Sequence, residues 1–173
     1  LPISSSGHLI FINELFSWED INLTLIVAAH LGTLFAVVNY FWEDCKKYFL
    51  LGPLEIFSKK KTFNFNLFLN LFYSSIPIII FGAFLNFHKI NYIYHPWLIA
   101  SSAIIFSLLL FFSDKNKTKK KLNNISFRDA LIIGIFQIFA LIPGSSRAGL
   151  CITAARFLGF NRICAAKYSM YLS

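Results

Sequence analysis

Two polar stretches in an otherwise apolar chain contain residue types that bind or transfer phosphate. They read "LPISSSGHL" from Leu1 and "IPGSSRAGL" from Ile142, and they align without gaps when Pro2 is placed over Pro143. Each has a proline, a pair of serines and a final leucine at the same spacing. Paired polar breaks of this kind mark ligand sites in membrane proteins that are built from inverted repeats. The two stretches therefore predict a duplicated unit.

The second stretch has the chemistry of an anion site. The planar guanidinium of Arg147 suits a phosphate or a carboxylate better than a lysine ammonium would. Ser145, Ser146 and the backbone N–H groups of the following helix add neutral donors and a positive dipole end. The alternative role for Arg147 is an ion pair with a lipid phosphate or with an internal carboxylate.

The first stretch has side chains that could act on a bound phosphate. His8 can serve as a nucleophile or a proton donor near neutral pH. Ser5 could donate a hydrogen bond to a phosphoryl group or attack it. The alternative for Ser4, Ser5 and Ser6 is a helix cap or the packing of small residues. Taken together, the two stretches predict phosphoryl chemistry.

The composition of the chain indicates that these residues are positioned by helices in a membrane. The 173 residues are 57% hydrophobic and 14% charged, and 21 of them are Phe. Soluble domains carry about 25% charged residues. Segments 21–42, 63–87 and 96–112 are apolar and have about the 20 residues that a transmembrane helix needs. We expect each of them to span the bilayer.

The segment that leads to the second polar stretch is too short to span. Residues 130–142 would extend part of the way across at about 1.5 Å per residue, and the helix then breaks at Pro143 and Gly144. We therefore predict a re-entrant hairpin over 130–160, the remnant of a first such loop over 1–20, and the start of a further transmembrane helix over 163–173. An arginine at the tip of such a hairpin is by default a functional residue.

The fold expected from these segments is all-α. It is a single polytopic integral membrane domain with inverted repeats and two re-entrant helix-loop-helix hairpins. Because the chain lacks an initiator methionine and stops within an apolar stretch, we expect it to be a fragment.

The formal charge of +8 is concentrated in loops. Lysines gather in loops 43–62 and 113–128, whereas loop 88–95 holds only Lys89. Basic loops face the cytoplasm, which places the first and third of these loops inside and the second outside. The opening stretch then lies at or below the outer face.

Two other classes of function are disfavoured. The positive residues form discrete runs between apolar blocks, which does not fit a nucleic-acid-binding face. Cys45, Cys151 and Cys164 are odd in number and lack metal-ligand spacing, so neither a disulfide framework nor a zinc site is expected.

Four stretches together resemble one bacterial family. In order and spacing, "LPISSSGHL", "VAAHLGTLFAVV", "DALIIGIFQIFALIPGSSRAG" and "TAARFLGFNR" are similar to the undecaprenyl-diphosphatase family, also known as the bacitracin-resistance protein family. The resemblance implies an enzyme of the bacterial inner membrane that hydrolyses undecaprenyl diphosphate to undecaprenyl phosphate and inorganic phosphate. That reaction recycles the carrier lipid of peptidoglycan synthesis. The family's two hairpin tips meet in one site that opens to the outer side.

The resemblance also assigns roles to single residues. Arg147 is expected to stabilise the charge of the transition state, and His8 to act as nucleophile or general acid with Ser5 orienting it. The choice of nucleophile between His8 and Ser5 stays open. The residues expected to bind the substrate are Ser4, Gly7, Gly144, Ser145, Ser146 and Arg147.

This sequence departs from the family pattern in two places. After the arginine the family continues Ser-Gly-x-Thr, where this chain has Ala148, Gly149, Leu150 and Cys151. Two hydroxyl groups are therefore missing, for which Thr153 or the thiol could partly substitute. The family's pair of glutamates would lie before Leu1, so the expected Mg²⁺ or Ca²⁺ has no visible ligand, and Gln137 in the related part of the second repeat is neutral. We expect this stretch alone to be inactive.

The expected partners are undecaprenyl diphosphate and bilayer lipid, with no nucleic acid, and a homodimer is allowed for. Two other functions stay open. A prenyl-phosphate or small-anion transporter of the inverted-repeat type would use the same paired loops and a midplane arginine. A diphosphate-binding membrane protein without activity would account for Ala148 and Cys151.

Overall fold

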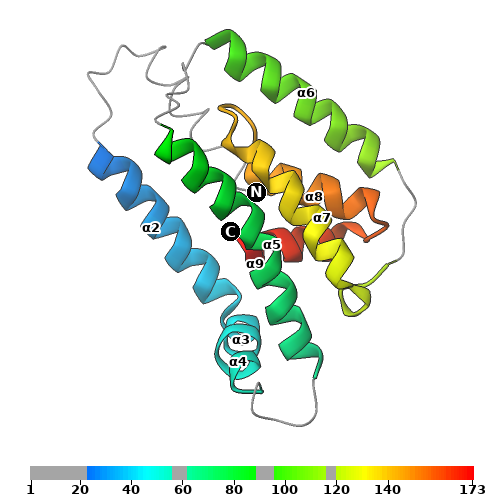
Figure 1. Cartoon of the computed structure of the whole chain (residues 1–173). Helices are drawn as coiled ribbons and strands as arrows, with labels where there is room; N and C mark the ends of the chain where they lie inside the picture. Colours follow the sequence, from blue (N-terminus) through cyan, green and yellow to red (C-terminus); the bar gives the residue numbers. More distant parts are fainter. Residues whose placement is uncertain (1–22, 56–61, 89–95, 116–119) are drawn as a thin grey trace. The chain divides into compact units, whose positions relative to one another are not determined.

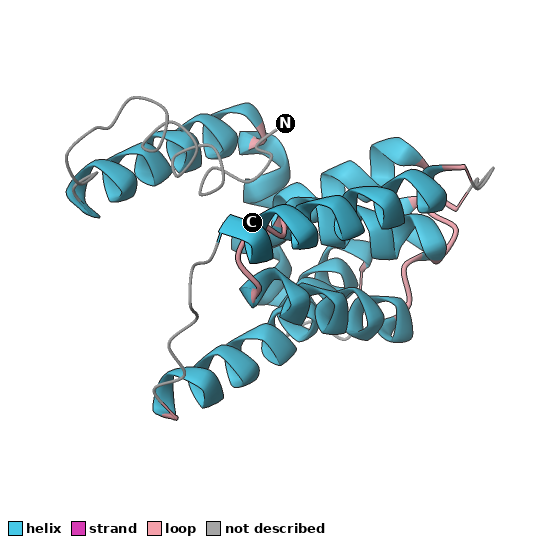
Figure 2. Ribbon diagram, turned by 90° about the horizontal axis from the view of Figure 1, so that it is seen from above, coloured by secondary structure: helices cyan, strands magenta, loops and turns pink. Residues whose placement is uncertain are grey.

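The computed structural model describes residues 23–55, 62–88, 96–115 and 120–173, and in these ranges the chain is helical (Figures 1 and 2). They contain no β-strand, only an isolated parallel bridge between Lys120 and Phe160. The described residues form two compact units, the first ending at Phe68 and the second running from Leu69 to Ser173. The all-helical part of the predicted fold is confirmed.

The first unit begins with α2, Leu23–Tyr40, which lies within the predicted span 21–42; its apolar part, Val27–Tyr40, is shorter than the two candidate spans described below. The predicted loop 43–62 is wrong for its first half. Helical structure continues there through α3 (Trp42–Cys45), a π-helix (Lys46–Leu51) and α4 (Gly52–Leu54). Lysine is a good helix former, and the aromatic residues beside the lysines have partners, as in the edge-to-face contact of Tyr48 and Phe63.

Two long helices match the second and third predicted spans. They are α5, Phe63–Phe87, and α6, Pro96–Asp114. In the described residues, Phe63–Phe87 and Trp97–Asp114 are long and apolar enough to cross a membrane. Helix α5 is continuous through Pro77.

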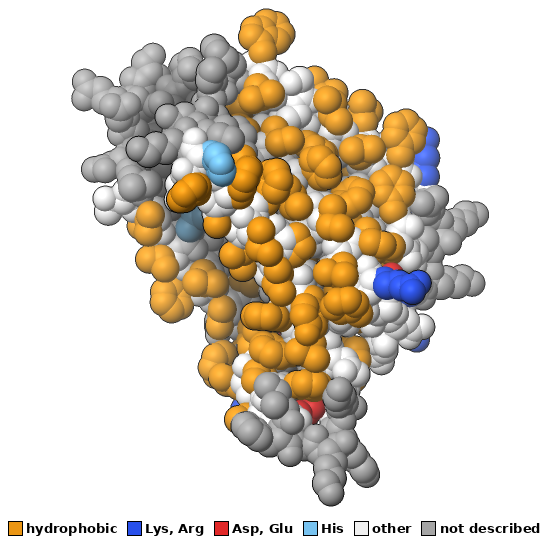
Figure 3. Space-filling view, in the orientation of Figure 1, with side chains coloured by type: hydrophobic (Ala, Val, Ile, Leu, Met, Phe, Trp, Pro, Cys, Tyr) orange, Lys and Arg blue, Asp and Glu red, His pale blue; other side chains and the backbone are white. Residues whose placement is uncertain are grey.

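The outward faces of these helices are apolar. The exposed side chains include Ile79, Ile80 and Phe84 on α5 and Ile104 and Leu108 on α6. Figure 3 shows that many of the described side chains on the visible face are apolar. Exposed apolar surface on long apolar helices is what a membrane-spanning segment presents to lipid.

Three short helices follow. They are α7 (Phe127–Ile138), which a 3-10 turn extends to Leu141, α8 (Arg147–Phe157) and α9 (Arg162–Leu172). Helix α8 packs against α6, α7 and α9 (Figure 1). Its residues Leu150, Ala154 and Ala155 are each 1% exposed. The core of the second unit is therefore built around α8, whose first residue is Arg147.

The ends of α6, α8 and α9 are joined by one carboxylate. Asp114 accepts two hydrogen bonds from Arg162, at 2.8 and 2.6 Å, and lies 3.2 Å from Nε of the buried Arg156. Arg156 also donates to the carbonyl oxygens of Phe160 and Asp114. The "TAARFLGFNR" stretch thus supplies the cations that hold three helix ends together.

The start of α7 is fixed near the same region. Ser126 and Asp129 form a reciprocal capping box, and Lys120 Nζ lies 2.6 Å from Asp129 Oδ2. Lys120 also lies over the ring of Phe160. Since α7 and α8 are both anchored at this end, the turn between them lies at the other.

Candidate anion site at the turn between α7 and α8

The turn that carries the predicted residues is braced by α6. Gly144 has a φ of +89° and lies against the start of α6, where a Cβ atom would overlap the carbonyl oxygen of Ile99. Ser102 of α6 donates a hydrogen bond of 2.6 Å to the carbonyl oxygen of Pro143. Gly144 therefore has a structural part in the site, because it lets the turn pack on α6.

The two predicted serines are used differently. The hydroxyl of Ser145 donates to the carbonyl oxygens of Phe139 and Ile142, each at 2.7 Å. Ser146 is the N-cap of α8, and its side-chain oxygen accepts from the N–H of Gly149 at 3.2 Å. Because Ser146 accepts at this position, its own hydroxyl proton can still be donated to a ligand. The geometry thus favours Ser146 over Ser145 as a hydrogen-bond donor to a bound anion.

Arg147 is half-buried at the first position of α8. Its Nε donates to Oε1 of Gln137 at 3.0 Å. In the part of the chain that the structure describes, Arg147 forms no ion pair with a carboxylate. One of its five N–H groups is used by Gln137, and the other four belong to the terminal nitrogens, which present a fork suited to phosphate.

Gln137 is a site residue that the sequence interpretation underrated. Its side chain is fully buried, and Nε2 donates to the carbonyl oxygen of Ser74 in α5 at 3.0 Å. An amide within the apolar run 130–142 was the available signal, because a buried amide needs partners for both of its ends. The sequence does not reveal that one of those partners is Arg147.

The first turn of α8 adds backbone donors to the site. The N–H groups of Arg147 and Ala148 have no carbonyl four residues earlier within the helix to bind. They also lie at the positive end of the helix dipole, which favours a bound anion. Cys151, whose thiol could partly replace the missing hydroxyl groups, is buried, as is the nearby Thr153. Both are 1% exposed, and Thr153 donates to the carbonyl oxygen of Gly149 within its own helix.

The first predicted stretch, with Ser4, Ser5, Gly7 and His8, lies outside the described residues. Among the residues that are described, no three His, Cys, Asp or Glu side chains come together to hold a metal ion. The ligands expected for the cation lie outside the described residues, so the cation stays a prediction.

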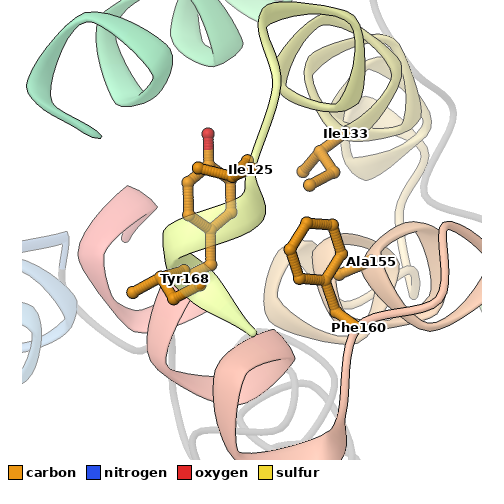
Figure 4. Close-up of a pocket in the computed structure, with 6 residues that line it drawn as sticks. Ile125, Ile133, Ala155, Phe160 and Tyr168 are labelled. Carbon is orange, nitrogen blue, oxygen red and sulfur yellow. The ribbon is translucent and has the colours of Figure 1, made fainter. Parts of the chain in front are cut away.

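An apolar crevice in the same unit is no alternative phosphate site. It has no room for a water molecule, and its lining includes Ile133, Phe160 and Tyr168. In Figure 4 the Tyr168 ring lies among apolar side chains with its hydroxyl directed toward α5. That hydroxyl is hydrogen-bonded with Ser74 and donates to the carbonyl oxygen of Asn70.

Comparisons with known proteins agree with the four stretches singled out above. All residues from 1 to 173 match the family described as "Bacitracin resistance protein BacA". The "Undecaprenyl-diphosphatase" of Jannaschia sp. is 42% identical over 178 residues, covering 100% of this chain and 66% of the relative. Those of Saccharophagus degradans and Aliivibrio salmonicida are each 41% identical, covering 100% of this chain and 65% of each relative. The chain thus spans just under two thirds of the length of these relatives. It belongs to the bacitracin resistance protein BacA family.

Proposed function

We propose that this chain carries part of the active site of an integral membrane phosphatase. Its reaction is the hydrolysis of undecaprenyl diphosphate to undecaprenyl phosphate and inorganic phosphate, which recycles the cell-wall carrier lipid and gives bacitracin resistance. The observation that carries the proposal is Arg147, held at the start of α8 by a neutral amide and with no ion pair among the described residues. The family and the printed names of its relatives supply the reaction.

In this proposal the turn binds the diphosphate. The terminal N–H groups of Arg147 contact phosphate oxygens, and Ser146 and the first N–H groups of α8 add neutral donors. Phosphoryl transfer needs positioning and stabilisation of negative charge more than covalent chemistry by the protein. Water adds across the P–O–P bridge and one phosphate leaves. His8 or Ser5 supplies the nucleophile or the proton transfer, as the resemblance implies.

The proposed architecture places this turn inside the bilayer. Helices α7 and α8 have 12 and 11 residues. At about 1.5 Å per residue, each extends roughly half the way across a hydrocarbon core of about 30 Å. They would form the second re-entrant hairpin of an inverted repeat in the bacterial cytoplasmic membrane. Its ends lie near the basic loop 113–128 on the inner side, and its site opens outward.

A divalent cation, Mg²⁺ or Ca²⁺, is part of the proposal, although no described residue is assigned to it. The cation and the substrate are tested together. The full-length gene product, purified in detergent, is expected to release inorganic phosphate from a prenyl diphosphate when Mg²⁺ or Ca²⁺ is present and to stop when the cation is chelated.

Arg147 is tested in the same assay. The variant Arg147→Ala should lose at least about 10²-fold in rate, the scale expected for one transition-state charge contact. Arg147→Lys should recover only part of that rate, because lysine keeps the charge without the bidentate fork. A folded parent that binds the lipid and releases no phosphate would contradict the proposal and favour a transporter or a binding protein.

A further inference from the structure

We infer that Gln137 is a positioning residue, which orients Arg147 through a neutral hydrogen bond and so leaves the charge of Arg147 available to an anion. The inference rests on the proposed function of the turn as a diphosphate site. It adds a requirement to that function: the group that holds the arginine must accept a hydrogen bond and must carry no charge.

The hydrogen-bond partners fix the orientation of the Gln137 amide. An arginine guanidinium has only donors and a backbone carbonyl has only acceptors. The end 3.0 Å from Arg147 Nε must therefore be the oxygen, and the end 3.0 Å from the carbonyl of Ser74 must be the NH₂ group. With both ends bonded and the side chain 0% exposed, Gln137 has no alternative partner in water.

The carbonyl of Ser74 is itself held in place by close helix packing. Ala130, Gly134 and Gln137 lie on one face of α7, at the spacing of successive turns. A Cβ atom at Gly134 would be 2.6 Å from the carbonyl oxygen of Ser74, so α5 and α7 approach closely there. The Ser74 hydroxyl donates to the carbonyl of Ala130 at 2.7 Å and lies 2.7 Å from the hydroxyl of Tyr168 in α9. Three helices thus fix the anchor of Gln137.

The neutrality of the amide is what makes this arrangement suited to an anion. A carboxylate at the same place would also accept from Arg147, but it would compensate the positive charge and weaken the attraction to a phosphate. An apolar side chain would leave the guanidinium without a fixed acceptor, and the terminal N–H groups of Arg147 would no longer be held in one orientation. The amide alone combines orientation with an uncompensated charge.

The test is a double-mutant cycle on the full-length gene product. Gln137→Met removes both hydrogen bonds of the amide, and Gln137→Glu keeps the acceptor for Arg147, adds a charge and removes the donor to the Ser74 carbonyl. Gln137→Met is also combined with Arg147→Ala. The readouts are the binding of inorganic pyrophosphate by calorimetry, and KM and kcat for a prenyl diphosphate. Ser113→Ala is the matched control, because it removes a fully buried hydroxyl whose hydrogen bond goes to the carbonyl oxygen of Leu110 in the same helix, and not to Ser74, Gln137 or Arg147.

We expect Gln137→Met to lower kcat/KM by about 10-fold or more, the scale of a lost hydrogen bond to a charged group, when Arg147 is present. In the Arg147→Ala background it should cause no further loss. Gln137→Glu should raise KM and weaken pyrophosphate binding, because its carboxylate compensates the charge of Arg147. Ser113→Ala should lower the unfolding temperature and leave KM unchanged.

Three results would overturn the inference. Equal losses from Gln137→Met in both backgrounds would mean that Gln137 is only a packing residue. Pyrophosphate binding by Gln137→Glu as tight as in the parent would mean that neutrality is irrelevant. If the parent releases no phosphate, the proposed function fails, but the pyrophosphate cycle still decides the role of Gln137. A parent that binds no pyrophosphate would overturn it as well.

Discussion

At the scale of single residues, the site divides into groups that contact a ligand and groups that aim them. Arg147 and Ser146 belong to the first kind, and their types and spacing predict an anion site. Gln137 and Ser102 belong to the second, and they act across 10 and 41 positions of sequence. Side-chain chemistry can be predicted locally, whereas these contacts depend on how α5, α6 and α7 pack.

Two glycines with the same backbone conformation give a residue-scale prediction. Gly144 and Gly159 have φ values of +89° and +94°, but only at Gly144 would a Cβ atom meet other atoms. An alanine at either position incurs the strain of a left-handed residue, about 1–2 kcal/mol. We expect Gly159→Ala to lose that much stability and keep phosphate release. Gly144→Ala should lose more stability and most activity, because the overlap with Ile99 displaces the turn. Thermal unfolding measures the stability of both variants, and phosphate release measures their activity. Equal losses of stability and activity in the two variants would contradict the role given to the contact of Gly144 with Ile99.

At the scale of elements, the long helices could be predicted and the short ones only in part. Length and hydropathy suffice for α5 and α6, because membrane spans need little tertiary information. The break after α7 follows from Pro143 and Gly144. The lysines of 42–54 favour a loop by their charge. The stretch is helical nevertheless, because lysine does not end a helix.

The close approach of α5 and α7 gives the first prediction at this scale. Gly134→Ala gains about 0.8–1.0 kcal/mol of helix propensity. It also places a methyl group 2.6 Å from the Ser74 carbonyl oxygen, and overpacking costs about 1–3 kcal/mol. We expect net destabilisation and reduced phosphate release, because the anchor of Gln137 moves. Gly32→Ala in α2 is the control, since no atom lies within 4 Å of its Cβ position. It should be neutral or stabilising, and the same result for Gly134→Ala would contradict the expectation.

The start of α7 gives a prediction about pH. Burial alone would raise the pKa of Asp129, but the hydrogen bonds from Lys120 and Ser126 outweigh it and hold that pKa below its ordinary value. A carboxyl whose pKa is lowered by folding stabilises the protein above its unfolded pKa of about 4, and this stabilisation is lost as the pH falls through the lower folded value.

Asp129→Asn should therefore cost about 1–2 kcal/mol at neutral pH, the scale of a lost helix cap. This loss of stability should begin to shrink below about pH 4, where the carboxyl of the unfolded parent becomes protonated, and should shrink further as the pH falls through the lower folded pKa. Asn161→Ala is the control, because it removes the neutral N-cap of α9, so that its loss of stability should not change with pH. Thermal unfolding from pH 3 to 7 measures both variants. A loss of stability in Asp129→Asn that is constant over this pH range would show that the ion pair with Lys120 contributes nothing to the stability of the fold.

At the scale of the whole molecule, charge and helix length together suggest a direction across the membrane. Lys120, Asp129 and Arg162 gather where α6 ends and α7 and α9 begin, next to the basic loop 113–128. The turn with Arg147 lies one short helix away. This polarity could be predicted from loop charge, but the joint role of Asp114 could not, because it depends on three helix ends meeting.

The direction itself is the last prediction. In a background with Cys45, Cys151 and Cys164 replaced by serine, single cysteines are introduced as His88→Cys at the end of α5 and Lys121→Cys before α7. Both parent residues are exposed. Because basic loops stay in the cytoplasm, a membrane-impermeant maleimide should label His88→Cys in intact cells and Lys121→Cys only after permeabilisation. The reverse pattern would place the start of α7 and the end of α8 on the outer side. The turn with Arg147 would then open to the cytoplasm, which would contradict the proposed outward-facing site.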